Sequence, residues 1–145
     1  MSYRKTSHSV YDIKYHVVWI TKYRKRVLRG QVGLRLRDLV RQVCAAEDIL
    51  IVSGNIQPDH VHLLISVPPN LAVSQVMHKI KGRSSRKLLQ EFEDLKKEFW
   101  GRHLWARGYF AASTGNVTDE IIKQCIESQG KQLPGTEDNF DVGEL

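Results

Sequence analysis

Two histidines separated by one residue are the side chains of this sequence best arranged for chemistry. His60 and His62 lie in residues 58–67, where a Pro-Asp pair precedes a largely apolar run. In a β-strand both rings would share one face, roughly 6.6 Å apart along the chain, because side chains alternate with a period of two. Two imidazoles held by a strand can bind one small cation. The alternative is a half-buried strand whose histidines only face solvent.

A third candidate ligand lies near the end of a predicted helix. Residues 118–129 begin with a threonine suited to an N-cap and two acids suited to the first turn. Within this helix Cys125 and Gln129 are four residues apart and therefore neighbours on one stripe. If the histidine strand lies opposite, Gln129 could add an amide oxygen to the imidazoles. Such ligands, together with water, suit Mg²⁺ or Mn²⁺ better than they suit metals that prefer thiolates.

Basic side chains are concentrated ahead of the C-terminal segment. The formal net charge is +6, although residues 130–145 hold one lysine against four acids. A positive field on a small domain favours a polyanion, and nucleic acid is the simplest one. The alternative is a solvated basic surface. The residues that we expect to contact phosphates or a stacked base are Lys22, Tyr23, Arg24, Lys25, Lys79, Lys81, Arg83 and Arg86.

The elements that must position these residues alternate between strand and helix patterns. Gly54 and Asn55 indicate a break or bulge, and Gly82 indicates a kink or the close approach of another chain, because glycine costs about 1 kcal/mol inside a helix. Trp100 and Trp105 are expected in the core. The pattern predicts strands at residues 11–20, 50–52, 60–67 and 109–113, and helices at residues 31–47, 73–92 and 118–129.

Length and composition indicate one compact domain. The 145 residues predict a single domain over 1–129, followed by an acidic, flexible tail over 130–145. Cys44 and Cys125 lack metal-ligand spacing, which indicates reduced thiols in a cytoplasmic protein. No apolar run approaches the roughly 20 residues of a membrane span, so no membrane partner is expected.

Several segments together resemble the single-tyrosine HUH transposases of insertion sequences of the 200/605 type. They are residues 15–19 with 22–24, residues 58–64 and residues 122–129, in the family's order and spacing. The resemblance implies an α+β, ferredoxin-like or RRM-like fold, with an antiparallel sheet flanked by helices. It also implies a homodimer that acts on single-stranded DNA and recognises hairpins near the ends of the element.

The resemblance also assigns chemical roles. In such transposases a helix-borne tyrosine attacks a phosphodiester, forms a 5′-phosphotyrosine link and exchanges strands. His60 and His62 match the metal-binding histidines, Gln129 matches the third ligand, and a divalent cation, Mg²⁺ or Mn²⁺, acts as a Lewis acid on the phosphate. The tyrosine position holds Cys125 instead. We therefore expect metal-dependent cleavage and rejoining to be absent or severely weakened.

Two other functions compete with the transposase interpretation. A non-catalytic relative could bind single strands or hairpins through the same basic residues. A nucleotide hydrolase of the histidine-triad kind would use His60 and His62, but it needs a further histidine where Leu64 stands.

Overall fold

The chain folds around one four-stranded antiparallel sheet with the strand order β4-β5-β3-β6. The computed structural model describes residues 3–100 and 102–113. The predicted last helix, with Cys125 and Gln129, and the acidic tail lie outside the described residues. The elements of the β-α-β-β-α-β unit are β3 (Lys14–Ile20), α1 (Gly30–Ala46), β4 (Leu50–Gln57), β5 (His60–Ser66), α2 (Val73–Glu91) and β6 (Phe110–Ser113). This order and pairing confirm the predicted ferredoxin-like α+β fold.

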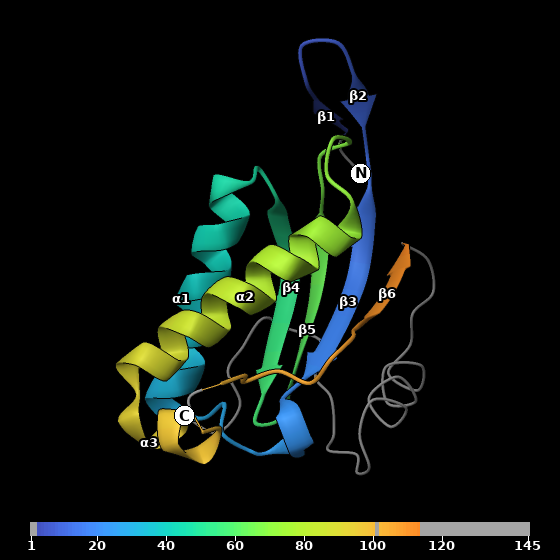
Figure 1. The fold of residues 1–145 in the computed structure, drawn as a ribbon. Coiled ribbons are helices and arrows are strands. Elements are labelled where there is room, and N and C mark those ends of the chain that lie inside the picture. Colours follow the sequence, from blue (N-terminus) through green and yellow to red (C-terminus); the bar gives the residue numbers. More distant parts are fainter. Residues whose placement is uncertain (1–2, 101, 114–145) are drawn as a thin grey trace.

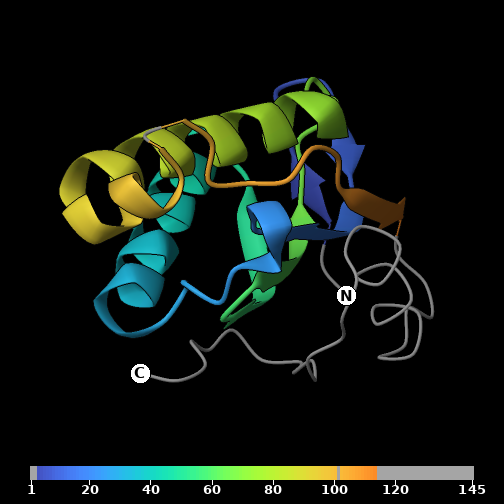
Figure 2. The ribbon, with the colours of Figure 1, turned by 60° about the horizontal axis from the view of Figure 1, so that its bottom comes forward.

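Both long helices, α1 and α2, cover the same face of the sheet (Figures 1 and 2). Their apolar stripes meet the strand residues whose side chains point to that face, such as Val17, Val61 and Leu63, all fully buried. Burial of this shared surface supplies the main drive for folding. The two central strands, β3 and β5, lie in the middle of the sheet, so side chains on them are held on both sides by paired neighbours.

Three boundaries differ from the sequence-based prediction. The predicted first strand is split, because its beginning pairs in a separate small hairpin of β1 (Arg4–Lys5) and β2 (Val10–Tyr11), which projects from the domain (Figure 1). Strand β4 runs on through Gly54 and Asn55, and its register shift lies earlier, between Ile51 and Ser53. Helix α2 continues through Gly82 without a break.

The segment after α2 holds one correct and one incorrect core prediction. It contains the short helix α3 (Glu93–Glu98) and then both tryptophans. Trp105 is buried and packs edge-on against Trp19, with ring centroids 5.7 Å apart. Trp100 is 87% exposed, so its assignment to the core was wrong; it follows the end of α3 with a positive φ that turns it outward from the chain path. In the described part of the chain, every helix is too short or too polar to span a membrane.

Candidate functional site

The two central strands bring the predicted histidines to the sheet face opposite to α1 and α2. His60 pairs with Ile20 and His62 pairs with Val18 across β3 and β5. Directly paired residues of antiparallel strands share a face, so the alternation predicted for β5 is confirmed. We call this side of the sheet the histidine face. Both rings are buried, with 1% of His60 and 7% of His62 exposed.

The ring of His60 is oriented by its neighbour in the tight turn between β4 and β5. Nδ1 of His60 lies 2.9 Å from Oδ1 of Asp59. Burial by itself would raise the pKa of Asp59, but hydrogen bonds with His60 and Arg24 and the guanidinium charge outweigh burial and lower this pKa. The carboxylate is therefore an anion that only accepts hydrogen bonds, so Nδ1 of His60 donates. In the neutral ring this leaves the lone pair on Nε2, as a metal-binding histidine requires.

A second histidine pair lies beside His62. Nδ1 of His16, on β3, is 3.1 Å from Nε2 of His62, and the two rings stack with centroids 5.4 Å apart. Partial burial lowers the pKa of His16, which favours its neutral form. Between two neutral imidazoles one nitrogen donates and the other accepts, so each ring fixes the orientation of the other. His16 was not singled out in the sequence, because it lies forty-six residues from His62.

His60 supplies one donor that fits a divalent cation, whereas Nε2 of His62 lies 3.1 Å from Nδ1 of His16 and would have to leave that contact to act as a second donor. His60 presents an Nε2 lone pair, and imidazole nitrogen binds the first-row divalent metals. Within residues 3–100 and 102–113, no group of three His, Cys, Asp or Glu side chains surrounds a position for an ion. A ligand from elsewhere would have to complete the coordination. The predicted third ligand, Gln129, lies outside the described residues and stays a prediction.

The basic residues that were expected to bind nucleic acid fall into three structural groups. Arg24 is buried, and its Nε and Nη2 lie 3.0 and 2.8 Å from Oδ2 of Asp59. Lys25 pairs with Glu98, and Lys79 pairs with Glu47 at 3.0 Å. Those that line a common groove are Lys22, Tyr23, Lys81 and Arg86, whereas Arg83 is exposed on α2 outside that lining.

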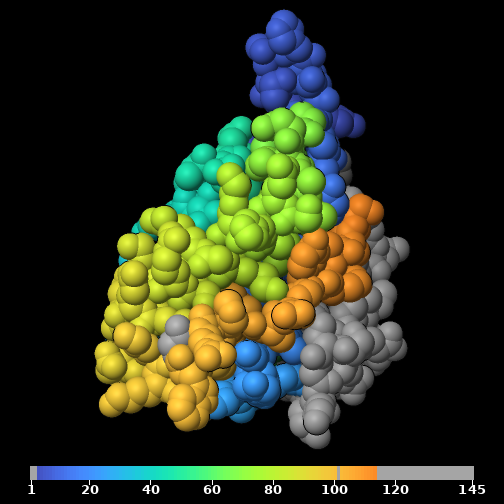
Figure 3. Space-filling model, in the orientation of Figure 1, coloured from blue at the N-terminus to red at the C-terminus, as the bar shows by residue number. Residues whose placement is uncertain are grey.

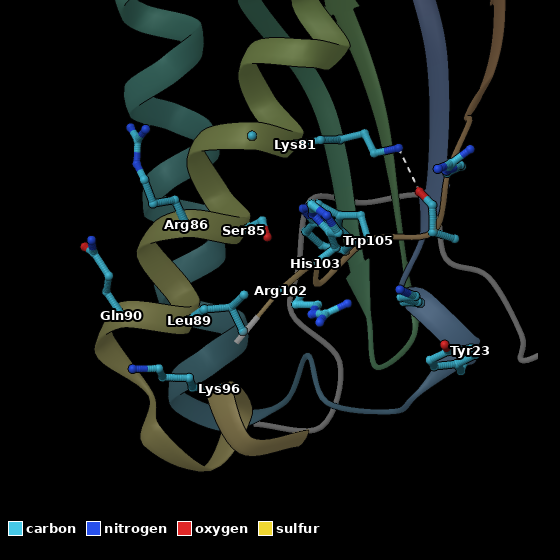
Figure 4. A pocket seen from close by; sticks show the side chains of 14 residues that line it. Tyr23, Lys81, Ser85, Arg86, Leu89, Gln90, Lys96, Arg102, His103 and Trp105 are labelled. Carbon is cyan, nitrogen blue, oxygen red and sulfur yellow. Dashed lines mark hydrogen bonds between the residues drawn. The ribbon is translucent and has the colours of Figure 1, made fainter. Parts of the chain in front are cut away.

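The groove is open, has a volume of about 1090 Å³ and runs between α2 and the 3-10 turn η1 (Lys22–Arg24). In Figure 4, Lys81 and Ser85 extend from α2 toward the groove and Tyr23 lies on the η1 side. Figure 3 shows the segment that follows α3, in orange, lying across the surface between these elements. We call it the basic groove, because the charged residues in its described lining are all basic: Lys22, Lys81, Arg86, Lys96, Arg102 and Arg107.

Lys81 lines the groove and also binds the backbone of the segment that forms one of its walls. Its Nζ donates to the carbonyl oxygens of Ala106 at 2.9 Å and Gly108 at 2.8 Å (Figure 4). Burial lowers the pKa of Lys81. Two of its three donors are thus used on the backbone. Arg102 and Arg107, which the sequence analysis missed, add two cations to the described lining; each lies two residues after a tryptophan, which was the only signal.

Of the two cysteines, only Cys44 lies in the described part of the chain. It lies on the buried side of α1, and burial raises the pKa of its thiol to about 12. Cys44 is therefore a packing residue with no part in the site.

Comparison with known sequences identifies the family of this chain. The family model described as "Transposase IS200 like" matches residues 9–129. The ISDra2 transposase TnpA of Deinococcus radiodurans is 36% identical over 120 residues, which cover 83% of this chain and 86% of that protein. The transposase for insertion sequence element IS200 of Salmonella typhimurium is 33% identical over 135 residues, covering 90% and 89%.

Two solved structures are also similar to this chain. A crystal structure from Deinococcus radiodurans R1, of a protein assigned as a transposase, has a TM-score of 0.80 and 33% identity and covers 88% of this chain and 98% of that one. A REP-associated tyrosine transposase bound to a REP hairpin has a TM-score of 0.53 at 16% identity, covering 83% and 66%, and supports the fold alone. The matched family model spans both histidines and most of the chain, and the chain belongs to the IS200-like transposase family.

Proposed function

We propose that this transposase binds hairpin ends of single-stranded DNA and carries a metal-dependent site for strand cleavage and rejoining. The proposed ligands are His60, His62 and Gln129, with Mg²⁺ or Mn²⁺ as the cation and a homodimer as the active assembly. The basic groove is the proposed DNA surface. With Cys125 at the tyrosine position, cleavage by this chain is absent or severely weakened.

One observation carries the proposal of a metal site. The Asp59 carboxylate accepts a hydrogen bond from Nδ1 of His60, so that the proton stays on Nδ1 and Nε2 keeps its lone pair, and His62 lies on the same face two residues along β5. A histidine that served only to fill space would not need a buried carboxylate beside it. A bound divalent cation would supply Lewis-acid polarisation of the scissile phosphate. The residues of the chain then orient the DNA and keep the ligands aligned.

The basic groove supports the proposal of a DNA partner. Its described lining carries six Lys or Arg side chains and no acid, beside Tyr23, which is 75% exposed and available for stacking on a base. Phosphate contacts position a nucleic acid, and aromatic faces accept unpaired bases. A structural neighbour with the same fold was solved with a REP hairpin, which is the kind of ligand proposed here.

Cys125 weakens the proposed reaction through its chemistry. In the reaction of a tyrosine, the phenol oxygen bonds to phosphorus, the bond from phosphorus to the 3′ oxygen breaks, and the proton ends on the 3′ hydroxyl. A thiolate is a good nucleophile, but its phosphorothiolate ester would have to reverse as readily as an aryl phosphate for strands to be exchanged. The alternative function, non-catalytic binding of hairpins, follows if no step proceeds.

The test restores the nucleophile. Single-stranded oligonucleotides that cover the genomic DNA on both sides of the gene are incubated with the full chain and with Cys125→Tyr, in Mg²⁺ or Mn²⁺. We expect Cys125→Tyr to form a covalent protein–DNA adduct, seen as a shifted band on a denaturing gel, and the unaltered chain to form little or none.

Two controls define the outcome. Cys125→Phe adds the ring without its hydroxyl and should bind the oligonucleotide without forming an adduct, and EDTA should abolish the adduct of Cys125→Tyr. A folded Cys125→Tyr protein that binds these DNAs but never forms an adduct contradicts the cleavage proposal and favours the non-catalytic alternative.

A further inference from the structure

Three side chains from two separate segments form a buried chain that ends at the proposed metal ligand. Arg24 comes from η1, whereas Asp59 and His60 come from the turn before β5. The guanidinium holds Oδ2 of Asp59 through two hydrogen bonds of 2.8 and 3.0 Å, and Oδ1 of the same carboxylate holds Nδ1 of His60 at 2.9 Å. Each carboxylate oxygen therefore serves a different partner, and Asp59 bridges the arginine to the histidine.

The backbone fastens the two segments together around this bridge. The amide of Thr21 donates to the carbonyl of Asp59 at 3.0 Å, and the amide of Leu28 donates to the carbonyl of Pro58 at 2.9 Å. Backbone hydrogen bonds therefore hold the two segments together on both sides of Arg24. Small movements of η1 relative to the β4–β5 turn would be transmitted to the carboxylate.

The arrangement is a costly way to stabilise a fold. The side chains of Arg24 and Asp59 are only 8% and 4% exposed, and a buried ion pair gains little over an apolar contact because both charges lose their hydration. Nη1 of Arg24 is buried and has no hydrogen-bond partner among the described residues. Tyr23 and Arg24 also adopt left-handed backbone angles, with φ of 61° and 54°, which side chains other than glycine rarely adopt.

We propose that Arg24 is a positioning residue for the metal ligand His60 and acts through Asp59. The guanidinium fixes the carboxylate in place, the carboxylate fixes the proton of His60 on Nδ1, and Nε2 is left with its lone pair on the histidine face. Arg24 therefore serves the metal site and makes no contact with DNA, unlike its neighbours Lys22 and Tyr23. This inference deepens the proposed function and rests on His60 being a metal ligand.

Two measurements on the metal-free and metal-loaded full chain test it. Long-range ¹H–¹⁵N NMR spectra of the histidine rings report which nitrogen of His60 carries the proton, and the EPR signal of free Mn²⁺ gives the dissociation constant. In Arg24→Gln we expect a mixture of His60 tautomers and a loss of Mn²⁺ affinity of about 10-fold to 100-fold, as is common when the partner of a ligating histidine is removed. Arg24→Lys keeps the charge but loses the two-point contact. Its Mn²⁺ affinity should lie between those of the unaltered chain and Arg24→Gln.

The matched control is a surface arginine that also donates from Nε and Nη2 to a single carboxylate group. Arg35 holds Glu91 through Nε at 2.8 Å and Nη2 at 3.0 Å, far along α1 from the histidine face. Arg35→Gln should leave both the tautomer and the Mn²⁺ affinity unchanged. Asp59→Asn, which is nearly isosteric, supplies a second route to the same result if Arg24→Gln does not fold.

The outcomes separate the inference from the proposed function. A folded Arg24→Gln protein with a single Nδ1-protonated His60 and unaltered Mn²⁺ affinity overturns the inference. If the unaltered chain binds no Mn²⁺, the proposed metal site fails, and the role of Arg24 as positioning residue for a ligand fails with it. If the unaltered chain binds Mn²⁺ and only the Arg24 and Asp59 variants lose affinity together with the tautomer, the inference stands.

Discussion

At the scale of single residues, buried hydroxyl and carboxylate groups of the described chain stabilise the site through hydrogen bonds. Ser84 is the simplest case. Its Oγ donates to the carbonyl of Ile80 at 2.6 Å and accepts from Nε1 of Trp105 at 3.0 Å. Ser84 is 1% exposed and joins α2 to the segment that forms a wall of the basic groove.

We predict that Ser84→Ala destabilises the protein by about 1–3 kcal/mol, because the buried indole N–H of Trp105 loses its acceptor. Urea unfolding followed by tryptophan fluorescence measures the change in the free energy of unfolding. Ser74→Ala, at the exposed beginning of α2, is the control and should change it by less than about 0.5 kcal/mol. Equal effects of both substitutions would show that the hydrogen bond to the indole adds nothing measurable to the free energy of unfolding.

Some residue roles could be predicted from the sequence and others could not. The shared face of His60 and His62 follows from spacing alone, because the period of a strand leaves no other choice. The roles of Arg24 and His16 depend on contacts between strands and turns that are distant in sequence. Arg24 also reaches Asp59 through a left-handed turn, and no hydrophobic period reports such a turn.

At the scale of elements, α2 combines a core stripe with one wall of the basic groove. Its buried side includes Val76, Ile80 and Leu88, and its other side presents Lys81, Gly82 and Arg86 to the groove. Gly82 is exposed, and a Cβ built there would meet nothing within 4 Å. The fold therefore does not need glycine at this position.

We predict that Gly82→Ala raises the free energy of unfolding by up to about 1 kcal/mol, because alanine favours a helix interior. If DNA approaches the backbone of α2 closely, the same substitution lowers the affinity for single-stranded DNA. Thermal unfolding and fluorescence anisotropy measure the two effects separately. Gly108→Ala is the control for stability: its φ of +80° disfavours alanine, so this variant should lose stability. A Gly82→Ala protein less stable than the unaltered chain contradicts the prediction.

The long elements were predictable because each has a clear apolar period. Helix α1 was expected over 31–47 and occupies Gly30–Ala46, and α2 was expected over 73–92 and occupies Val73–Glu91. The split of the first strand was missed, because Tyr11 and Val17 belong to the same β-rich run although they pair in different sheets. The position of Trp100 was missed because an aromatic residue near a second tryptophan reads as core.

At the scale of the whole molecule, six basic side chains of the described residues are gathered along one groove. The described lining of the basic groove brings together basic residues from η1, α2, α3 and the segment that follows them. The other predicted basic residues are neutralised by Asp59, Glu98 and Glu47 or lie outside the lining. Net charge and composition favoured a polyanion partner, but only the fold shows which cations come together in the described lining of the groove.

We predict that DNA affinity depends steeply on salt and that this dependence is set by the groove. For single strands, the slope of log K against log salt changes by about 0.7 for each phosphate contact. Removing two groove cations, Arg102→Ala with Arg107→Ala, should therefore flatten the slope by about 1.4 in anisotropy titrations between low and moderate salt. Arg83→Ala, on α2 but outside the lining, is the comparison. An equal flattening per residue by Arg83→Ala would place the DNA over a wider surface than the groove.

The 3-10 turn η1 connects the basic groove to the histidine face. Tyr23 stands in the basic groove, and the very next residue, Arg24, grips the carboxylate behind His60. Only one peptide unit, held at unusual angles, separates the two side chains. A base that stacked on Tyr23 and shifted this peptide unit would therefore also move the ring of His60. If this changed the affinity for the cation, a bound cation would change the affinity for single-stranded DNA by the same factor.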